Sequence, residues 1–425
     1  MKVMNYTRWV MTEIFFTLSV FSAVLFGIYA MSVKLNNGLS DSQLTILSGI
    51  FFIVFAISQL LSGILINKIS PKVLLGFSAL IAAFGAFFFA NSHEFIWLML
   101  ARALLGLGLG CTFVGVLYIV QISFSQRQFP FFSSFSQSIA NIFTGILALV
   151  AGNSLSQYGY NIAYNILGGL FIFSAITLAI VLPHTHNKQT SHVNVAFFSS
   201  LKQILKKRNF WLACFYFTGL FGAILTFTDL FNVTYQATIF QVPRTTAIML
   251  NGMTPLGVAA GGITAGLLVS KFQKNQLTAS VFSFITLISM FVILYVRIPH
   301  EASYAPWFII DFIFGFGCGG AMLAFQEIQI LLKDAVLRPL ANSIILTFAY
   351  LFNGLILQPL TGYIIGATEI NHSAYYSQAE LYFIWLYDNK IHDTWHKFNN
   401  GLTVVILMLV ICFISSFFFS KVNKK

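Results

Sequence analysis

Apolar stretches of about 20 residues recur along the whole chain, and short polar segments separate them. A helix of about 20 apolar residues is long enough to cross the ~30 Å hydrocarbon core of a membrane. The pattern therefore predicts twelve membrane-spanning helices. We place them at residues 12–33, 44–66, 73–90, 95–120, 131–153, 163–182, 210–237, 246–269, 277–296, 305–332, 340–366 and 402–420.

Composition strengthens this interpretation. The chain has 425 residues, of which 58% are hydrophobic and only 8% charged, whereas an average soluble domain has about 25% charged residues. So little polar surface cannot shield an apolar core of this size from water. The sequence therefore excludes a soluble globular protein and indicates an all-α integral membrane protein.

The second half of the chain repeats patterns of the first. Glycines at 106, 108 and 110 follow Arg102, and glycines at 315, 317 and 319 follow Asp311, which lies 209 residues later. At the same offset, residues 140–145 match residues 349–354. Internal repeats of this length are typical of transporters built from two similar bundles. We therefore predict two pseudo-symmetric bundles of six helices.

The glycines also predict how the helices pack. Glycines four residues apart occur at 106 and 110, 257 and 261, 262 and 266, and 315 and 319. This spacing lets two helix backbones approach closely inside a membrane. A dinucleotide-binding loop is a poor alternative for the first of these pairs, because no strand precedes it.

A polar segment separates the two predicted bundles. We expect an N-terminal bundle at 1–182, a cytoplasmic linker at 183–209 and a C-terminal bundle at 210–425. Within the linker, apolar residues recur at helical spacing beside Lys202, Lys206 and Lys207. This pattern favours a short helix on the inner membrane surface, with a solvated linker as the alternative.

The net charge of +11 reflects orientation in the membrane. With a cytoplasmic N-terminus, 17 of the 23 Lys and Arg residues fall on inner segments and five on outer loops, while Arg102 lies within a span. Inner segments of membrane proteins carry such an excess of positive charge. We therefore expect both termini in the cytoplasm of a bacterium, a location in the inner membrane, and anionic lipids rather than nucleic acid as partners.

No sequence feature indicates a cofactor or a metal. The four cysteines lie inside predicted spans, without the spacing of a metal site or a disulfide framework. The first apolar stretch is too long for a cleavable signal peptide, and no cleavage site follows it before Lys34. We interpret this stretch as the first span and expect a monomer.

Two short motifs resemble one family. After the second span the chain has Gly63, Asn67, Lys68, Ser70 and Lys72, and a related copy follows the eighth span as Gly266, Ser270, Lys271 and Lys274. This pattern resembles the loop motif of the major facilitator superfamily, although Asn67 stands where the family has Asp and Ser70 where it has a second Gly. The resemblance implies twelve helices, transport by alternating access, and a central cavity lined by spans one, four, seven and ten.

Five charged residues interrupt the apolar spans. An ionisable group in hydrocarbon costs about 2.5 to 3.5 kcal/mol or more, so it persists only with a partner, water or a function. These residues are Glu13, Arg102, Asp229, Asp311 and Glu327. All five lie on spans one, four, seven and ten, so the resemblance implies that they face the cavity.

The direction of each span predicts the depth of these charges. Span ten enters from outside, so Asp311 lies near the outer surface and Glu327 roughly 24 Å deeper. We expect Arg102 and Asp229 in the outer half as well. Glu13 and Glu327 are expected near the inner end, together with Tyr118, Gln121, Gln326 and Gln329.

The sequence suggests a role for each group. A carboxylic acid in apolar surroundings holds a proton more readily than in water, so the proton-coupling candidates are Asp229, Glu327 and Glu13. The substrate-binding candidates are Arg102, Tyr118, Gln121, Asn141 and Gln326. Arg102 and Asp311 form a candidate gate. A purely structural ion pair is the alternative for the gate, and an interfacial position is the alternative for Glu13.

We predict a secondary active transporter that takes up a small polar or anionic organic solute together with protons, and not an enzyme. The chain has no nucleotide-binding loop, which excludes an autonomous ATP-driven pump. Uptake is favoured because residues 137–152 lack the Gly-Pro pair that resembling drug-proton antiporters carry in span five. The alternatives are a multidrug or siderophore exporter and, in another class, a receptor or scaffold that does not transport.

Overall fold

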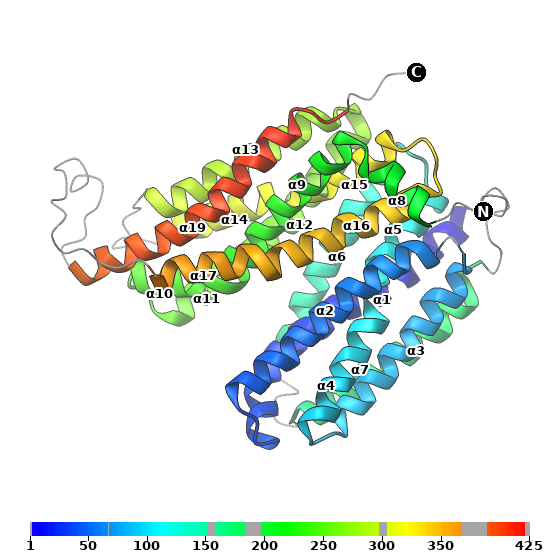
Figure 1. Cartoon of the computed structure of the whole chain (residues 1–425), viewed down its shortest axis with the longest axis horizontal. Helices are drawn as coiled ribbons and strands as arrows, with labels where there is room; N and C mark the ends of the chain where they lie inside the picture. Colours follow the sequence, from blue (N-terminus) through cyan, green and yellow to red (C-terminus); the bar gives the residue numbers. More distant parts are fainter. Residues whose placement is uncertain are drawn as a thin grey trace. The chain divides into compact units, whose positions relative to one another are not determined.

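The protein is described here by a computed structural model, which defines residues 2–66, 68–150, 159–183, 197–296, 304–367 and 389–420. Helices make up almost all of these residues, and no strand occurs among them. The chain divides into two compact units. Unit 1 consists of Met1–Lys207 and Ile328–Thr347, and unit 2 consists of Arg208–Glu327 and Phe348–Lys425. Figure 1 shows the course of the helices within each unit.

The first eight helices of the chain belong to unit 1. They are α1 (Lys2–Asn36), α2 (Asp41–Leu65), α3 (Pro71–Ala90), α4 (Phe95–Leu109), α5 (Thr112–Ser123), α6 (Phe129–Val150), α7 (Gly159–Val181) and α8 (Phe197–Leu205). The fourth predicted span is thus α4 followed by α5. The Ser70 hydroxyl accepts a hydrogen bond of 3.4 Å from the N–H of Val73, and Pro71 opens α3. The residue that departs from the family's glycine therefore caps a helix.

The remaining helices begin at the start of unit 2. They are α9 (Arg208–Ala223), the π-helix η3 (Ile224–Phe231), α10 (Asn232–Ile239), α11 (Arg244–Asn251), α12 (Met253–Phe272), α13 (Asn275–Tyr295), α14 (Ala305–Cys318), the 3-10 helix η4 (Gly319–Met322), α15 (Leu323–Leu331), α16 (Leu337–Phe352), the π-helix η5 (Asn353–Leu357), α17 (Gln358–Ala367) and α19 (Asn389–Ser416). The end of α15 and the first part of α16 belong to unit 1.

The predicted fold class is confirmed. Eleven helical stretches among the described residues are long and apolar enough to cross a membrane. The 22-residue helix α6 stands at the position of the fifth predicted span and has four serines between residues 133 and 138. Two limits were predicted wrongly: α1 begins at Lys2 and α19 at Asn389. Both helices extend beyond their apolar stretch, because helical hydrogen bonding continues through polar residues as readily as through apolar ones.

The glycine rows hold helices together in the same way in both units. In unit 1, a side chain at Gly106 or Gly110 would strike the α2 backbone at Phe51 or Phe55, and one at Gly108 would strike α3. In unit 2, the equivalent glycines of span ten meet α12 and α13. They are Gly315 against Thr254, Gly317 against Thr286 and Gly319 against Val258 and Gly262. The prediction of close packing is confirmed for these rows, and the internal repeat is visible in the contacts.

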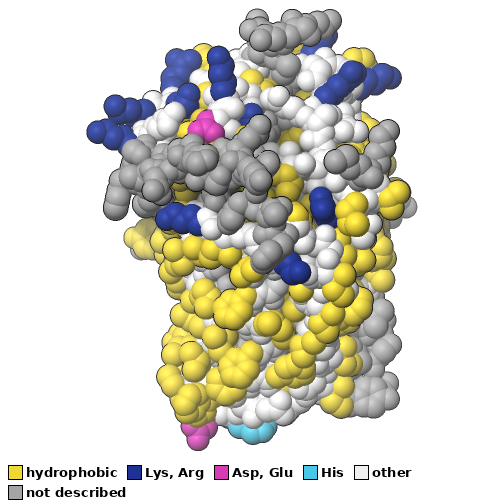
Figure 2. All heavy atoms as spheres, turned by 90° about the vertical axis from the view of Figure 1, so that its right-hand side faces the viewer, with side chains coloured by type: hydrophobic (Ala, Val, Ile, Leu, Met, Phe, Trp, Pro, Cys, Tyr) yellow, Lys and Arg dark blue, Asp and Glu magenta, His cyan; other side chains and the backbone are white. Residues whose placement is uncertain are grey.

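Hydrophobic side chains cover much of the outer surface of the helices, as the face in Figure 2 shows. Phe77 and Phe84 on α3 are 64% and 62% exposed, and Ile180 on α7 is 75% exposed. A soluble protein rarely presents so much apolar surface to water. These faces suit the hydrocarbon of a membrane.

The predicted linker is described only in part. Residues 184–196 lie outside the described residues, and α8 covers the rest up to Leu205. Ile204 of α8 is buried, while Lys202 and Lys206 are exposed. A helix on the inner membrane surface remains a prediction for this segment.

Candidate functional site

Four of the five charged residues inside the spans are buried. Relative exposure is 4% for Glu13, 1% for Arg102 and 0% for Asp311 and Glu327. Asp229 is instead exposed on η3, and its role in proton coupling stays a prediction. Residues 226–228 are the buried residues of η3, whereas Asp229 and Leu230 are exposed.

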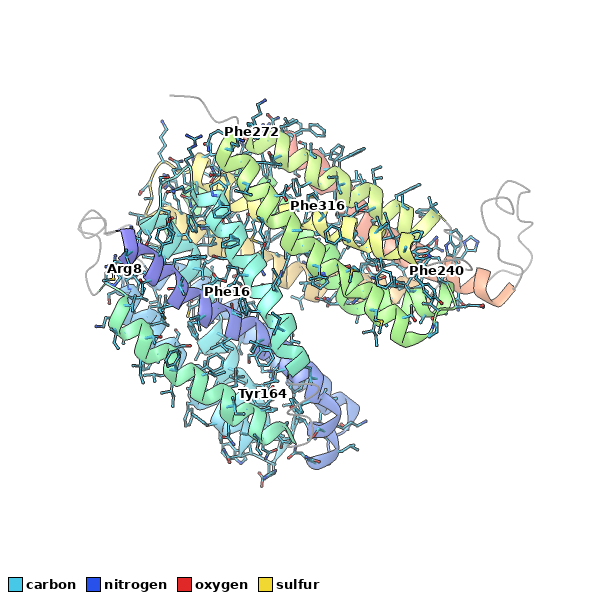
Figure 3. All side chains as sticks on the ribbon, turned by 180° about the vertical axis from the view of Figure 1, so that it is seen from behind. Arg8, Phe16, Tyr164, Phe240, Phe272 and Phe316 are labelled. Carbon is cyan, nitrogen blue, oxygen red and sulfur yellow. The ribbon has the colours of Figure 1, made fainter. Side chains whose placement is uncertain are left out.

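Arg102 on α4 lies between two aromatic rings. Its guanidinium carbon is 4.2 Å from the ring centre of Phe26 and 4.4 Å from that of Phe51. Its Nε donates a hydrogen bond of 3.1 Å to the carbonyl of Leu47. The hydroxyl of Tyr164, labelled in Figure 3, lies beside the guanidinium. The contact does not meet hydrogen-bond geometry, and both Nη1 of Arg102 and the hydroxyl remain without a partner.

Glu13 on α1 has no hydrogen-bond partner for either carboxyl oxygen within the described part of the chain. Ser136 on α6 lies close to the carboxyl, and its hydroxyl accepts a hydrogen bond of 2.8 Å from the Trp9 indole. The prediction left open whether Glu13 is interfacial. At 4% exposure it is a buried acid.

Asp311 on α14 ends a chain of amide side chains. Nε2 of Gln236 donates to Oδ2 of Asp311 at 2.6 Å and to Oδ1 of Asn232 at 2.9 Å. Asn232 in turn donates to Oδ1 of Asn251 at 2.8 Å. The network joins α10, α11 and α14, while Oδ1 of Asp311 and Oε1 of Gln236 have no partner. The described contacts of Asp311 come from its own unit, and so do those of Arg102.

The exposed Asp229 belongs to a part of unit 2 that is rich in aromatic rings. Tyr350 on α16 lies near its carboxylate. The Tyr350 ring packs edge-on against Phe221 at 5.2 Å, and Phe221 stacks on Phe217 at 5.2 Å. The π-helices η3 and η5 also contact each other, and Nε2 of Gln358 donates to the carbonyl of Leu225 in η3 at 2.9 Å. Short π-helices inside α-helices occur frequently at functional sites.

Glu327 on α15 differs from Glu13 because donors surround it. The backbone N–H of Ser420 donates to both carboxylate oxygens at 3.0 Å, and the Ser420 hydroxyl donates to Oε1 at 2.7 Å. Asn209 and Asn275 donate to the two oxygens at 3.3 and 3.4 Å. This is the environment of an ionised carboxylate in a structural role.

The remaining predicted residues fall into separate groups. Gln121 on α5 donates to the carbonyl of Ala335 at 3.1 Å and accepts from Gln329 at 3.5 Å, so these groups meet in unit 1. Tyr118 is buried on the same helix. Asn141 on α6 is half-buried and accepts a hydrogen bond of 3.2 Å from Gln137. Gln326 is buried in unit 2, and its Oε1 has no partner among the described groups.

Sequence reasoning missed several residues of these networks. Gln236, Asn232 and Asn251 are uncharged, so the search for charged groups in the spans passed over them. The polar pair at 232 and 236, four residues apart in an apolar span, was the available signal. Asn209 and Ser420 lie at the ends of spans, where polar residues are ordinary.

Within the described residues, no cluster of three or more His, Cys, Asp or Glu side chains could hold a metal. All four cysteines are buried and free.

Comparison with known proteins identifies the family. The sequence matches the major facilitator superfamily over residues 14–357. The chain belongs to this superfamily. It is therefore a multi-pass membrane protein of the family that the loop motifs suggested.

The individual relatives share only about a quarter of their residues or fewer with this chain. An uncharacterized transporter of Buchnera aphidicola is 24% identical over 61% of this chain, and the quinolone resistance protein NorA of Staphylococcus aureus is 26% identical over 60%. The chain spans 64% and 65% of the lengths of these two relatives. The crystal structure of the transporter FucP in its outward conformation superposes with a TM-score of 0.71 at 16% identity, over 96% of this chain and 97% of FucP. A second crystal structure, of the E. coli fucose:proton symporter FucP, superposes with a TM-score of 0.69 at 16% identity. These structures support the shared fold.

Proposed function

We propose that this superfamily member is a proton-coupled secondary transporter in which Glu13 carries the proton. The observation behind the proposal is that Glu13 is 4% exposed while neither of its oxygens has a donor. A buried carboxylate without hydrogen bonds costs several kcal/mol, whereas the protonated acid avoids most of this cost. Such a group gains and loses its proton as its access to water changes, which is what coupling requires.

Asp311 and Asp229 are the second and third candidates for coupling. Oδ1 of Asp311 has no partner, and its other oxygen accepts from Gln236. Asp229 is exposed, so it can exchange protons or meet a solute without a change in its burial. Glu327, a candidate from the sequence, is held by donors from three other segments, which favours a structural role. The gate between Arg102 and Asp311 stays a prediction.

For the solute we propose a small polar organic molecule with a positively charged group. An anionic solute held by Arg102 has less support than the sequence suggested, because Phe26 and Phe51 cover both faces of the guanidinium. The exposed charge inside the spans is the carboxylate of Asp229. Uptake remains the proposed direction, since span five lacks the Gly-Pro pair of drug antiporters. We also propose the cytoplasmic orientation of both termini and a bacterial inner membrane as the location.

One observation favours a second candidate, the export of hydrophobic organic cations. Tyr350, Phe221 and Phe217 form a row of rings in unit 2, and Tyr350 lies near Asp229. Aromatic faces attract organic cations, particularly beside a carboxylate. The relative NorA is named for quinolone resistance.

Reconstituted protein tests the proposal. Proteoliposomes with an imposed pH gradient are given labelled amino acids, carboxylates and cationic drugs, and both accumulation and gradient-free exchange are measured. We expect Glu13→Gln to abolish accumulation and to retain exchange, because exchange needs no net proton movement. The control Glu94→Gln changes an exposed glutamate in the same unit and should behave like the wild type. Undiminished accumulation by Glu13→Gln would show that Glu13 does not carry the proton. The direction in which the labelled solutes move decides between uptake and export.

A further inference from the structure

Arg102 is a buried cation, and no carboxylate among the described side chains of unit 1 neutralises it. The acidic residues of unit 1 whose side chains are described are Glu13, Glu94 and Asp334. Glu94 and Asp334 are exposed. Glu13 lies on α1 thirteen residues before Phe26, the ring that contacts Arg102, which corresponds to about 20 Å of helix. None of these groups pairs with the guanidinium.

One edge of the Arg102 guanidinium has an N–H group without a hydrogen-bond partner. Phe26 and Phe51 cover its two faces, and Nε is satisfied by the carbonyl of Leu47. On the remaining side, Nη1 has no acceptor. Tyr164 on α7 lies beside this group, is fully buried and also has no partner for its hydroxyl. Nη1 of Arg102 and the hydroxyl of Tyr164 therefore lie side by side, and neither donates a well-formed hydrogen bond to a described group.

The aromatic rings reduce the cost of the buried charge but do not cancel it. A cation over a ring gains about 2 kcal/mol when desolvated, whereas an unpaired buried charge costs several kcal/mol and normally has an ionic partner. A water molecule would satisfy the two donors and leave the positive charge in place. An anion satisfies both requirements.

We propose that unit 1 binds a small monovalent inorganic anion, such as chloride, between Nη1 of Arg102 and the hydroxyl of Tyr164. The anion must be small because the site is buried. Arg102 is 1% exposed and Tyr164 0% exposed, and the two phenylalanine rings cover the faces of the guanidinium. The ligand neutralises Arg102 where α1, α2, α4 and α7 each contribute a contact. It is a resident ion of unit 1, and its binding does not depend on the proposed proton coupling or on the solute.

Thermal unfolding of the purified protein in detergent tests the site. The unfolding midpoint is measured in sodium chloride, sodium acetate and sodium gluconate at equal sodium concentration. We expect the midpoint to rise with chloride concentration and not with gluconate, because a ligand that binds the folded state stabilises it in proportion to the logarithm of its concentration. Tyr164→Phe should weaken the apparent chloride affinity about tenfold through the loss of one hydrogen bond, and Arg102→Met should abolish the dependence.

Tyr160→Phe is the matched control. Tyr160 lies one helical turn before Tyr164 on α7 and is equally buried, but its hydroxyl accepts a hydrogen bond of 2.9 Å from Asn37. This variant should lose stability and keep the full chloride dependence. If Arg102→Met does not fold, Tyr164→Phe against Tyr160→Phe decides the question.

Three results would overturn the proposal. Equal midpoints in chloride and gluconate would mean that water suffices at Arg102. Chloride dependence that survives in both Tyr164→Phe and Arg102→Met would place the anion elsewhere. Stabilisation by acetate as strong as that by chloride would show that the site admits an organic carboxylate, such as that of a solute. A bromide ion located beside Arg102 by anomalous diffraction would confirm the site directly.

Discussion

The hydroxyl of Ser420 donates a hydrogen bond of 2.7 Å to Oε1 of Glu327, and the backbone N–H of Ser420 donates to both oxygens of the same carboxylate. This contact joins Ser420, which follows the last helix α19 (Asn389–Ser416), to span ten, 93 positions earlier in the chain. Asn209 and Asn275 bring the starts of α9 and α13 to the same group. Glu327 therefore fixes one end of unit 2.

Removal of the Glu327 carboxylate should destabilise the protein. In Glu327→Ala, the half-buried donors of Ser420 and the buried amide of Asn275 lose their acceptor, and each unsatisfied buried group costs about 1 to 3 kcal/mol. We expect a lower unfolding midpoint in detergent and a lower yield of folded protein. Ser420→Ala keeps the backbone donor and should show a smaller effect. Normal stability of Glu327→Ala together with complete loss of proton-driven transport would restore the coupling role that the sequence suggested.

The amide network should be required for the function of Asp311. Gln236→Leu removes the donor to Oδ2 of Asp311 and the link to Asn232. We expect this variant to lose proton-driven accumulation in proteoliposomes. Asn399→Leu is the control, since Asn399 is also a buried amide of unit 2, but it donates to the carbonyl of Leu294. If both variants transport equally well, the network plays no part in coupling.

The close approach of span ten to α12 predicts a difference between two glycines. A methyl group at Gly261 would overlap the backbone of Phe316, whereas one at Gly169 on α7 meets nothing within 4 Å. We expect Gly261→Ala to destabilise unit 2 by about 1 to 3 kcal/mol through overpacking. Gly169→Ala should be neutral or stabilising by up to about 1 kcal/mol, because alanine favours helix. Equal unfolding midpoints for the two variants would contradict the packing.

Cysteine labelling tests the orientation in the membrane. The four native cysteines are buried and should react slowly. Lys188, on the predicted inner side, lies outside the described residues. We therefore use Lys202→Cys as the labelling site on the inner side and Glu94→Cys as the labelling site on the outer side. Both positions are exposed. In intact cells, an impermeant maleimide should label Glu94→Cys and spare Lys202→Cys, because the positive charges lie inside. The opposite labelling would reverse the topology.

The sequence by itself determined the spans, the repeat and the close-packing glycines. Each of these depends on local composition: an apolar stretch must match the thickness of the bilayer, and a helix contact at Gly106 or Gly315 needs a residue without a side chain. Each of these constraints fixes the residue type at the position where it acts, so it can be read from the local sequence. For this reason the fold class could be predicted before the contacts of unit 1 and unit 2 were known.

Only the tertiary structure decided what each charge inside the membrane does. Glu13 and Glu327 look alike in the sequence, since both are glutamates near the inner end of a span. Asn209, Asn275 and Ser420 donate to Glu327 from 118, 52 and 93 positions away, while no described group donates to Glu13. Hydrogen-bond partners come from distant segments that folding brings together, so local sequence does not reveal whether a buried acid is held by donors or left free to carry a proton.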